Sequence, residues 1–145
     1  MDKLQTAGFV WFELLISASY LAMASALVER VLERPGVPAR ERLDLVCDLE
    51  AAMAGLENVA RQIPESQGEE AALVQCLYAR YAAQDAITRT APRAVELLGG
   101  MAFIEADDIT YLPAAVNGLG FHPPSPPKAA DDLSDHLAGG PLVIH

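Results

Sequence analysis

Glu13 is the only charged residue between Val10 and Val28, a segment that is otherwise largely apolar. Burial raises the pKa of a carboxyl group, and a carboxyl group with a raised pKa can transfer protons near neutral pH. Glu13 is therefore a candidate catalytic acid or base. The alternative is a solvent-reaching Glu13 near the start of a helix, where its charge complements the helix dipole.

Asp107 is the second candidate for acid or base chemistry. It belongs to an acidic cluster with Glu105 and Asp108, and such clusters are also typical of the first turn of a helix. His122 has a side chain that titrates near neutral pH, but a single histidine in a loop is more often an ordinary loop residue. Both interpretations stay open for each residue.

Two arginines and two glycines are candidates for cofactor binding. Arg89 and Arg93 are four residues apart and share one helix face, about two turns before Gly99 and Gly100. Their guanidinium groups could receive the phosphates of a nucleotide cofactor or of CoA. The alternative is that they pair with Asp85 and Glu96 on the same helix.

Neither cysteine suggests a metal site or a disulfide. Cys47 and Cys76 each lie within a helical pattern, without a CxxC or Cys/His spacing. We interpret both as buried, reduced thiols of a cytoplasmic protein and expect no metal.

The periodicity of apolar residues predicts an all-α fold. Helical patterns cover residues 6–33, the stretch that begins at Pro38, a long third segment that ends at Gly99-Gly100, and a shorter segment at 105–116. Pro92 is expected to kink or restart the third helix. Residues 1–121 are therefore predicted to form a helical bundle. Residues 122–145 are predicted to be a proline-rich extended tail with one short helix within 128–138.

Composition and charge exclude some partners. The net charge of -10 argues against a nucleic acid or an anionic membrane. Residues 10–28 have membrane length, but a helix that is apolar nearly all round can equally be the centre of a soluble bundle or oligomer. Nothing else in the sequence indicates a membrane protein, so we expect no membrane partner.

The order of helices and turns resembles the C-terminal domain of acyl-CoA dehydrogenases. The most specific part is the run Ala94-Val95-Glu96-Leu97-Leu98-Gly99-Gly100-Met101-Ala102-Phe103. Arg80-Tyr81-Ala82 also resembles the basic residue that precedes Tyr-Ala in that family. The resemblance covers about residues 9–122 and implies an up-and-down four-helix bundle.

The resemblance implies a flavin enzyme, but several expected residues differ. Members bind FAD across a subunit interface and oxidise the Cα–Cβ bond of an acyl thioester with a glutamate as base. We expect the N-terminal helical domain and the β-domain of such enzymes to be absent.

The flavin contacts of the bundle itself also differ. The family turn Arg-x-x-Phe-Gly matches Leu32-Glu33-Arg34-Pro35-Gly36, so the glycine is kept but the arginine that holds the pyrophosphate is not. Glu96 replaces a glutamine, and the segment after Gly100 lacks the catalytic glutamate and the Arg-Asp pair. Glu13 lies about one residue from the alternative position of the base.

The leading hypothesis is a stand-alone helical domain that acts through protein contacts. It would form a homo-oligomer, most simply a dimer, or dock on a separate flavoprotein and complete its site for an acyl thioester. The isolated chain is expected to hold no cofactor, and FAD only with a partner subunit. The alternatives are a flavin-free enzyme that uses Glu13 or Asp107 on a small apolar metabolite, and a purely structural module. The oligomer is expected because large apolar residues cover more of the first helix than one core absorbs. These residues are Phe9, Trp11, Phe12, Leu14, Leu15, Ile16, Leu21, Met23, Leu27 and Val28.

Overall fold

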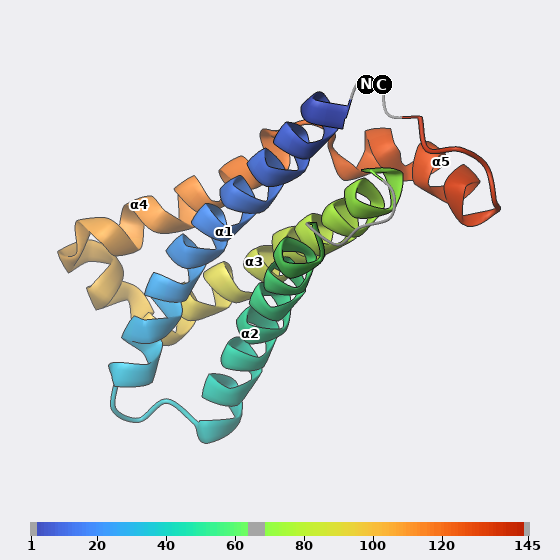
Figure 1. Cartoon of the computed structure of the whole chain (residues 1–145). Helices are drawn as coiled ribbons and strands as arrows, with labels where there is room; N and C mark the ends of the chain where they lie inside the picture. The colour runs from blue at the N-terminus through green and yellow to red at the C-terminus, as the bar shows by residue number, and fades with distance from the viewer. Residues whose placement is uncertain (1–2, 64–68, 144–145) are drawn as a thin grey trace.

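The chain folds into an antiparallel bundle of helices (Figure 1). The structure is a computed structural model that describes residues 3–63 and 69–143. Helices α1 (Lys3–Glu33), α2 (Ala39–Gln62), α3 (Glu69–Glu105) and α4 (Asp107–Ala115) alternate in direction, and a 3₁₀ helix, η2 (Val116–Phe121), and helix α5 (Pro126–Leu137) follow. The described residues contain no strand. The predicted all-α, up-and-down four-helix bundle is confirmed. The turn expected at 64–68 lies outside the described residues.

Helices α1 and α3 form the centre of the bundle. Leu21 and Leu27 of α1 and Leu77 of α3 have no exposed surface. Helix α2 covers one side of this pair, and α4 lies along α1 and α3. The segment after residue 121 also joins the core, because Ala129 and Leu133 of α5 are buried in the same cluster.

Two proline predictions need correction. Pro92 does not restart α3, in which Gly99 is the residue with non-helical torsions, and a kink at Pro92 stays a prediction. Pro92 is exposed, so the carbonyl that it crowds faces solvent and can tilt outward. The buried neighbours Ala91 and Ala94 hold the helix in place on either side. Pro126 and Pro127 occupy the first turn of α5, a favoured position for proline, so the extended segment is limited to residues 122–125.

Gly99 changes the direction of the chain without ending the helical region. Its φ of 78° is in the left-handed region that favours glycine. Its ψ of 165° is not that of a left-handed helical cap, and helix resumes from Gly100 to Glu105. The predicted end of the third helix is therefore a break within α3.

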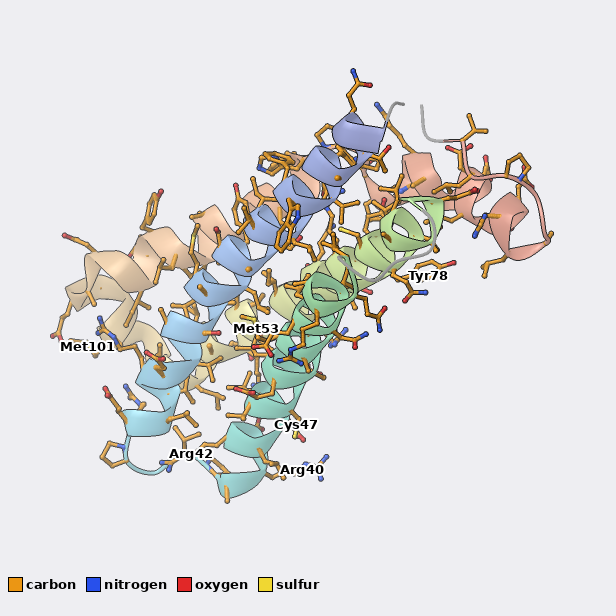
Figure 2. The ribbon with its side chains drawn as sticks, in the orientation of Figure 1. Arg40, Arg42, Cys47, Met53, Tyr78 and Met101 are labelled. Atoms are coloured by element: carbon orange, nitrogen blue, oxygen red, sulfur yellow. The ribbon has the colours of Figure 1, made fainter. Side chains whose placement is uncertain are left out.

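Helix α1 is long and apolar enough to cross a membrane when only length and composition are considered. Central helices of soluble bundles meet the same criterion. The absence of a membrane partner and the cytoplasmic location stay predictions. The expected burial of the thiols is confirmed for Cys76 but is wrong for Cys47, which is exposed on α2 (Figure 2).

Candidate functional site

A buried ion pair joins the two central helices. Nε of Arg80 in α3 lies 3.0 Å from Oε2 of Glu13 in α1, and both side chains have no exposed surface. Glu13 lies well inside α1, not at its start, so the interpretation of a solvent-reaching Glu13 is wrong. The buried position predicted for a catalytic Glu13 is observed, but the carboxylate is enclosed and paired.

Arg80 also holds the connection between η2 and α5. Its Nη1 donates to the carbonyl of Pro124 at 2.7 Å and its Nη2 to the carbonyl of Leu119 at 3.4 Å. Nη2 donates to the carbonyl of His122 as well. The hydroxyl of Tyr81 adds a second hydrogen bond to Pro124, at 2.9 Å. One buried guanidinium group thus fixes three backbone positions of residues 119–124 against α1 and α3.

Burial dominates the electrostatics around this pair. It raises the pKa of Glu13, and the positive charge of Arg80 only partly opposes this effect. Burial also raises the pKa of the Cys76 thiol to about 12, with a further contribution from the Glu13 carboxylate. Cys76 is therefore a thiol and not a nucleophilic thiolate at neutral pH.

A tyrosine–histidine pair lies on the solvent side of α1, where residues 119–124 pass. The hydroxyl of Tyr20 is 3.3 Å from Nε2 of His122. The His122 ring also contacts the ring of Phe12 edge-on, with 6.3 Å between ring centres. A Cβ on Gly118 would lie 2.6 Å from the Tyr20 hydroxyl, so only glycine lets this tyrosine pack against η2.

An apolar groove adjoins the Tyr20–His122 pair. The groove has a volume of about 360 Å³ and is open to solvent. It is lined by uncharged α1 side chains, namely Phe12, Leu15, Ile16, Ser19, Tyr20 and Met23. Phe12 and Tyr20 belong both to the groove and to the surroundings of His122, so the imidazole lies at its edge.

A second polar region lies at the other end of α1, where α1 turns into α2. Nη2 of Arg34 lies 3.5 Å from the position that a Cβ on Gly99 would take. Arg42 donates to the carbonyl of Arg34 at 2.7 Å and stabilises this turn. Figure 2 shows Arg42 near the start of α2, at the same end of the bundle as Met101. The turn that the family resemblance connects with FAD therefore meets the Gly99-Gly100 segment in space.

The predicted cofactor-binding arginines pair with carboxylates. Arg93 binds Glu41 of α2 at 2.6 Å and Glu96 at 2.7 Å, so the expected Arg93–Glu96 pair is present. Arg89 binds Asp48 of α2 at 3.1 Å instead of Asp85, whose charge only helps to raise the arginine's pKa. The hydrogen bond from Arg93 lowers the pKa of Glu41. Both arginines connect α2 to α3.

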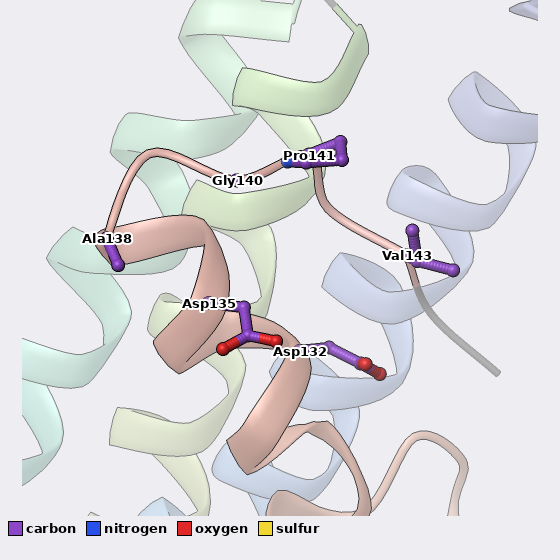
Figure 3. Close-up of a pocket in the computed structure, with 6 residues that line it drawn as sticks. All are labelled: Asp132, Asp135, Ala138, Gly140, Pro141 and Val143. Atoms are coloured by element: carbon purple, nitrogen blue, oxygen red, sulfur yellow. The ribbon is translucent and has the colours of Figure 1, made fainter.

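The remaining candidates are separate from these clusters. Asp107 is an exposed residue at the first position of α4, where its charge suits the helix dipole. Another hollow, of about 390 Å³, lies between α5 and the loop that follows it (Figure 3). It is lined by Asp132, Asp135, Ala138, Gly140, Pro141 and Val143. Within the part of the chain that the structure describes, no cluster of His, Cys, Asp or Glu is suited to a metal ion.

The sequence of the chain is similar to part of an amine N-hydroxylase. Isobutylamine N-hydroxylase of Streptomyces viridifaciens is 42% identical to this chain over 144 residues. The similarity covers 99% of this chain but only 38% of that protein. No family model and no solved structure match. The fold is thus an all-α bundle domain, and its sequence is similar to part of an N-hydroxylase. This finding supports the acyl-CoA dehydrogenase resemblance only indirectly.

Proposed function

We propose that the chain acts as the helical domain of a flavin-dependent enzyme that oxidises a small substrate, and that it is not catalytic alone. Other polypeptide segments would supply the rest of the flavin site. The substrate class that the similarity favours is a short alkylamine, with an acyl thioester as the class that the family resemblance implies. N-hydroxylation of an amine requires reductive activation of oxygen, which a bound flavin supplies.

The contact between Arg34 and Gly99 carries this proposal. Arg34 replaces the missing family arginine two positions later in the turn, and its guanidinium group lies over a glycine that presents only backbone. Within the described residues no carboxylate pairs with it. A guanidinium group is well suited to a pyrophosphate, because it donates several hydrogen bonds in one plane. The residues present therefore fit the phosphate end of a flavin nucleotide.

The negative charge of Glu96 opposes pyrophosphate binding less than an unpaired carboxylate at this position would. A carboxylate repels a pyrophosphate, but the Glu96 carboxylate pairs with Arg93 at 2.7 Å. Arg93 is shared with Glu41, so the pairing compensates only part of the negative charge of Glu96. Arg34, Gly99 and Gly100 are accordingly the residues of this chain that would contact the cofactor.

The exposed apolar side of α1 supports docking on a partner or a second copy. Trp11, Phe12 and Leu15 are 41%, 48% and 63% exposed. No charged side chain of α1 interrupts this face, because Glu13 points into the core. Contiguous apolar surface of this kind is typical of protein interfaces. Catalysis by the chain alone through Glu13 or Asp107 is not favoured, since Glu13 is enclosed and Asp107 has no site around it.

A chimera tests this function. The matched region of isobutylamine N-hydroxylase is replaced by this chain, and FAD binding and N-hydroxylation of isobutylamine are measured beside the isolated chain. We expect the chimera to bind FAD and to form the hydroxylamine, whereas the isolated chain does neither at micromolar concentration. A chimera that folds but binds no FAD would contradict the proposal.

A further inference from the structure

Arg42 is a second arginine at the turn between α1 and α2 that has no carboxylate partner within the described residues. Most arginines of the described chain do pair with carboxylates. These are Arg40, Arg61, Arg80, Arg89 and Arg93. Arg34 and Arg42 lack such a pair although the chain has a net charge of -10. Two neighbouring arginines without a carboxylate, in so acidic a chain, indicate a site for an external anion.

The backbone of the turn connects the two arginines. Nη2 of Arg42 donates to the carbonyl of Arg34 at 2.7 Å, and Nη2 of Arg34 lies 3.5 Å from the position of a Cβ on Gly99. Arg40 precedes Arg42 by two residues, which is about 200° around a helix. Figure 2 shows Arg42 on the side of α2 that faces the end of α1, and Arg40 on the opposite side. Arg42 is therefore the one of these two that reaches the turn.

The guanidinium group of Arg42 has donors that the turn does not use. A guanidinium group carries five N–H donors, and the hydrogen bond to the Arg34 carbonyl uses one of them. Nε of Arg42 is buried and has no hydrogen-bond partner. A buried N–H without an acceptor costs free energy, so an oxyanion at this guanidinium group would be stabilised. The residue is only half-buried, which lets an anion approach it from solvent.

We propose that Arg42 and Arg34 together bind the diphosphate group of the flavin nucleotide, and that Arg42 is thus a further cofactor-binding residue. This inference rests on the proposed function, because it names a second residue of the same phosphate site. Each phosphate of the diphosphate carries a negative charge, so Arg34 alone would leave one charge uncompensated. Guanidinium groups are well suited to both, because their planar donors match phosphate oxygens.

Nearby carboxylates do not neutralise the two arginines. Glu41 precedes Arg42 directly, and Glu96 lies three residues before Gly99. Both carboxylates bind Arg93, at 2.6 Å and 2.7 Å. Arg93 thus draws them away from the turn and leaves the charges of Arg34 and Arg42 for a ligand.

Arg42→Gln separates anion binding from the structural role of Arg42 in the turn. Glutamine keeps an N–H donor for the Arg34 carbonyl but has no charge. Arg40→Gln is the matched control, because it makes the same change of charge two residues away, on a side chain paired with Asp44. Circular dichroism shows whether both variants keep the fold. If Arg42→Gln does not, Arg42→Lys takes its place, since lysine keeps the charge but loses the planar set of donors.

Titration of the whole chain with inorganic pyrophosphate, followed by NMR of the arginine Nε–Hε signals, tests the inference. We expect the signals of Arg34 and Arg42 to shift saturably, with a dissociation constant on the order of millimolar, while the Arg40 signal stays unchanged. Arg42→Gln should weaken pyrophosphate binding about tenfold and reduce its dependence on salt. Arg42→Lys should weaken it by a smaller factor, and Arg40→Gln should leave it unchanged. Arg42→Gln should weaken FAD binding by the chimera by a similar factor of about ten.

Three results would overturn the inference. They are an Arg42 signal that does not respond to pyrophosphate, equal pyrophosphate affinities of Arg42→Gln and Arg40→Gln, and FAD binding by the chimera that weakens with Arg34→Ala but not with Arg42→Gln. The proposed function fails separately. Pyrophosphate binding at both arginines, beside a chimera that binds no FAD, rejects the flavin and keeps the two-arginine site.

Discussion

Replacing Arg80 should destabilise the fold far more than replacing its partner Glu13. Arg80→Met leaves a buried carboxylate without its counter-charge, which costs about 3–5 kcal/mol. It also leaves the carbonyl of His122 without the donor that it has in the structure, at about 1–3 kcal/mol for a buried group. The sum, about 4–8 kcal/mol, is a large share of the 5–15 kcal/mol that is typical of a domain.

Glu13→Gln should cost much less, below about 2 kcal/mol. The amide has the shape of the protonated carboxyl group, which is the form that burial favours at this position. Arg80 also keeps its hydrogen bonds to the carbonyls of Leu119, His122 and Pro124. Urea denaturation followed by circular dichroism measures both variants. Arg89→Met, which removes a surface pair with Asp48, is the matched control and should cost less than about 1 kcal/mol.

The difference in stability between the wild-type protein and Glu13→Gln also depends on pH. Burial raises the pKa of Glu13 above its ordinary value of 4.5, so the folded state binds this proton more tightly than the unfolded state. The resulting stability is fully present below pH 4.5 and is lost as the pH rises through the raised pKa. The wild-type protein should therefore lose stability relative to Glu13→Gln between pH 4.5 and neutral pH. A Glu13→Gln variant as unstable as Arg80→Met, or an opposite trend with pH, would refute this reasoning.

Three further predictions concern packing and assembly. Gly118→Ala should lower the stability measured by thermal unfolding by about 1–3 kcal/mol, because the new Cβ meets the Tyr20 side chain. Gly8→Ala is the control: Gly8 has open space around it, so this change should raise the stability by about 0.5–1 kcal/mol. Equal effects of the two changes would refute the packing argument. Sedimentation equilibrium at micromolar concentration should show a species heavier than the 15.5 kDa chain, and a constant 15.5 kDa would exclude an oligomer. The protein should purify from the soluble fraction without detergent, and recovery from membranes alone would reverse the assignment of α1.

The sequence predicted the helices because their signals are local. Apolar periodicity and the punctuation at Pro38 and Gly99 determine where most helices begin or break. The restart predicted at Pro92 and the extended backbone predicted at Pro126 and Pro127 were wrong, because the effect of a proline depends on whether its turn is exposed or lies at a helix start. Burial of neighbouring residues decides that, and a single sequence does not state it directly.

The candidate site was predicted only in part. Glu13 could be selected because a lone carboxylate in an apolar helix is conspicuous, but its partner is 67 residues away in the sequence. The position of Arg80 indicated a buried charge, because it follows Leu77 by three residues and so lies on the apolar face of α3. The Arg34–Gly99 and Tyr20–His122 contacts depend on how distant segments pack, so local patterns do not predict them.

The central claim is that the Arg34 end of this bundle contacts a flavin nucleotide. FAD titration of the chimera, followed by the change in flavin absorbance, measures this contact when Arg34→Ala is compared with Arg40→Ala. Arg40 is the control. It is an arginine in the first turn of α2 that is exposed and paired with Asp44. Loss of a charge-assisted hydrogen bond of about 1.5–3 kcal/mol predicts that Arg34→Ala weakens FAD binding about ten- to a hundredfold, while Arg40→Ala leaves it unchanged. Equal FAD affinity in the two variants would contradict the claim.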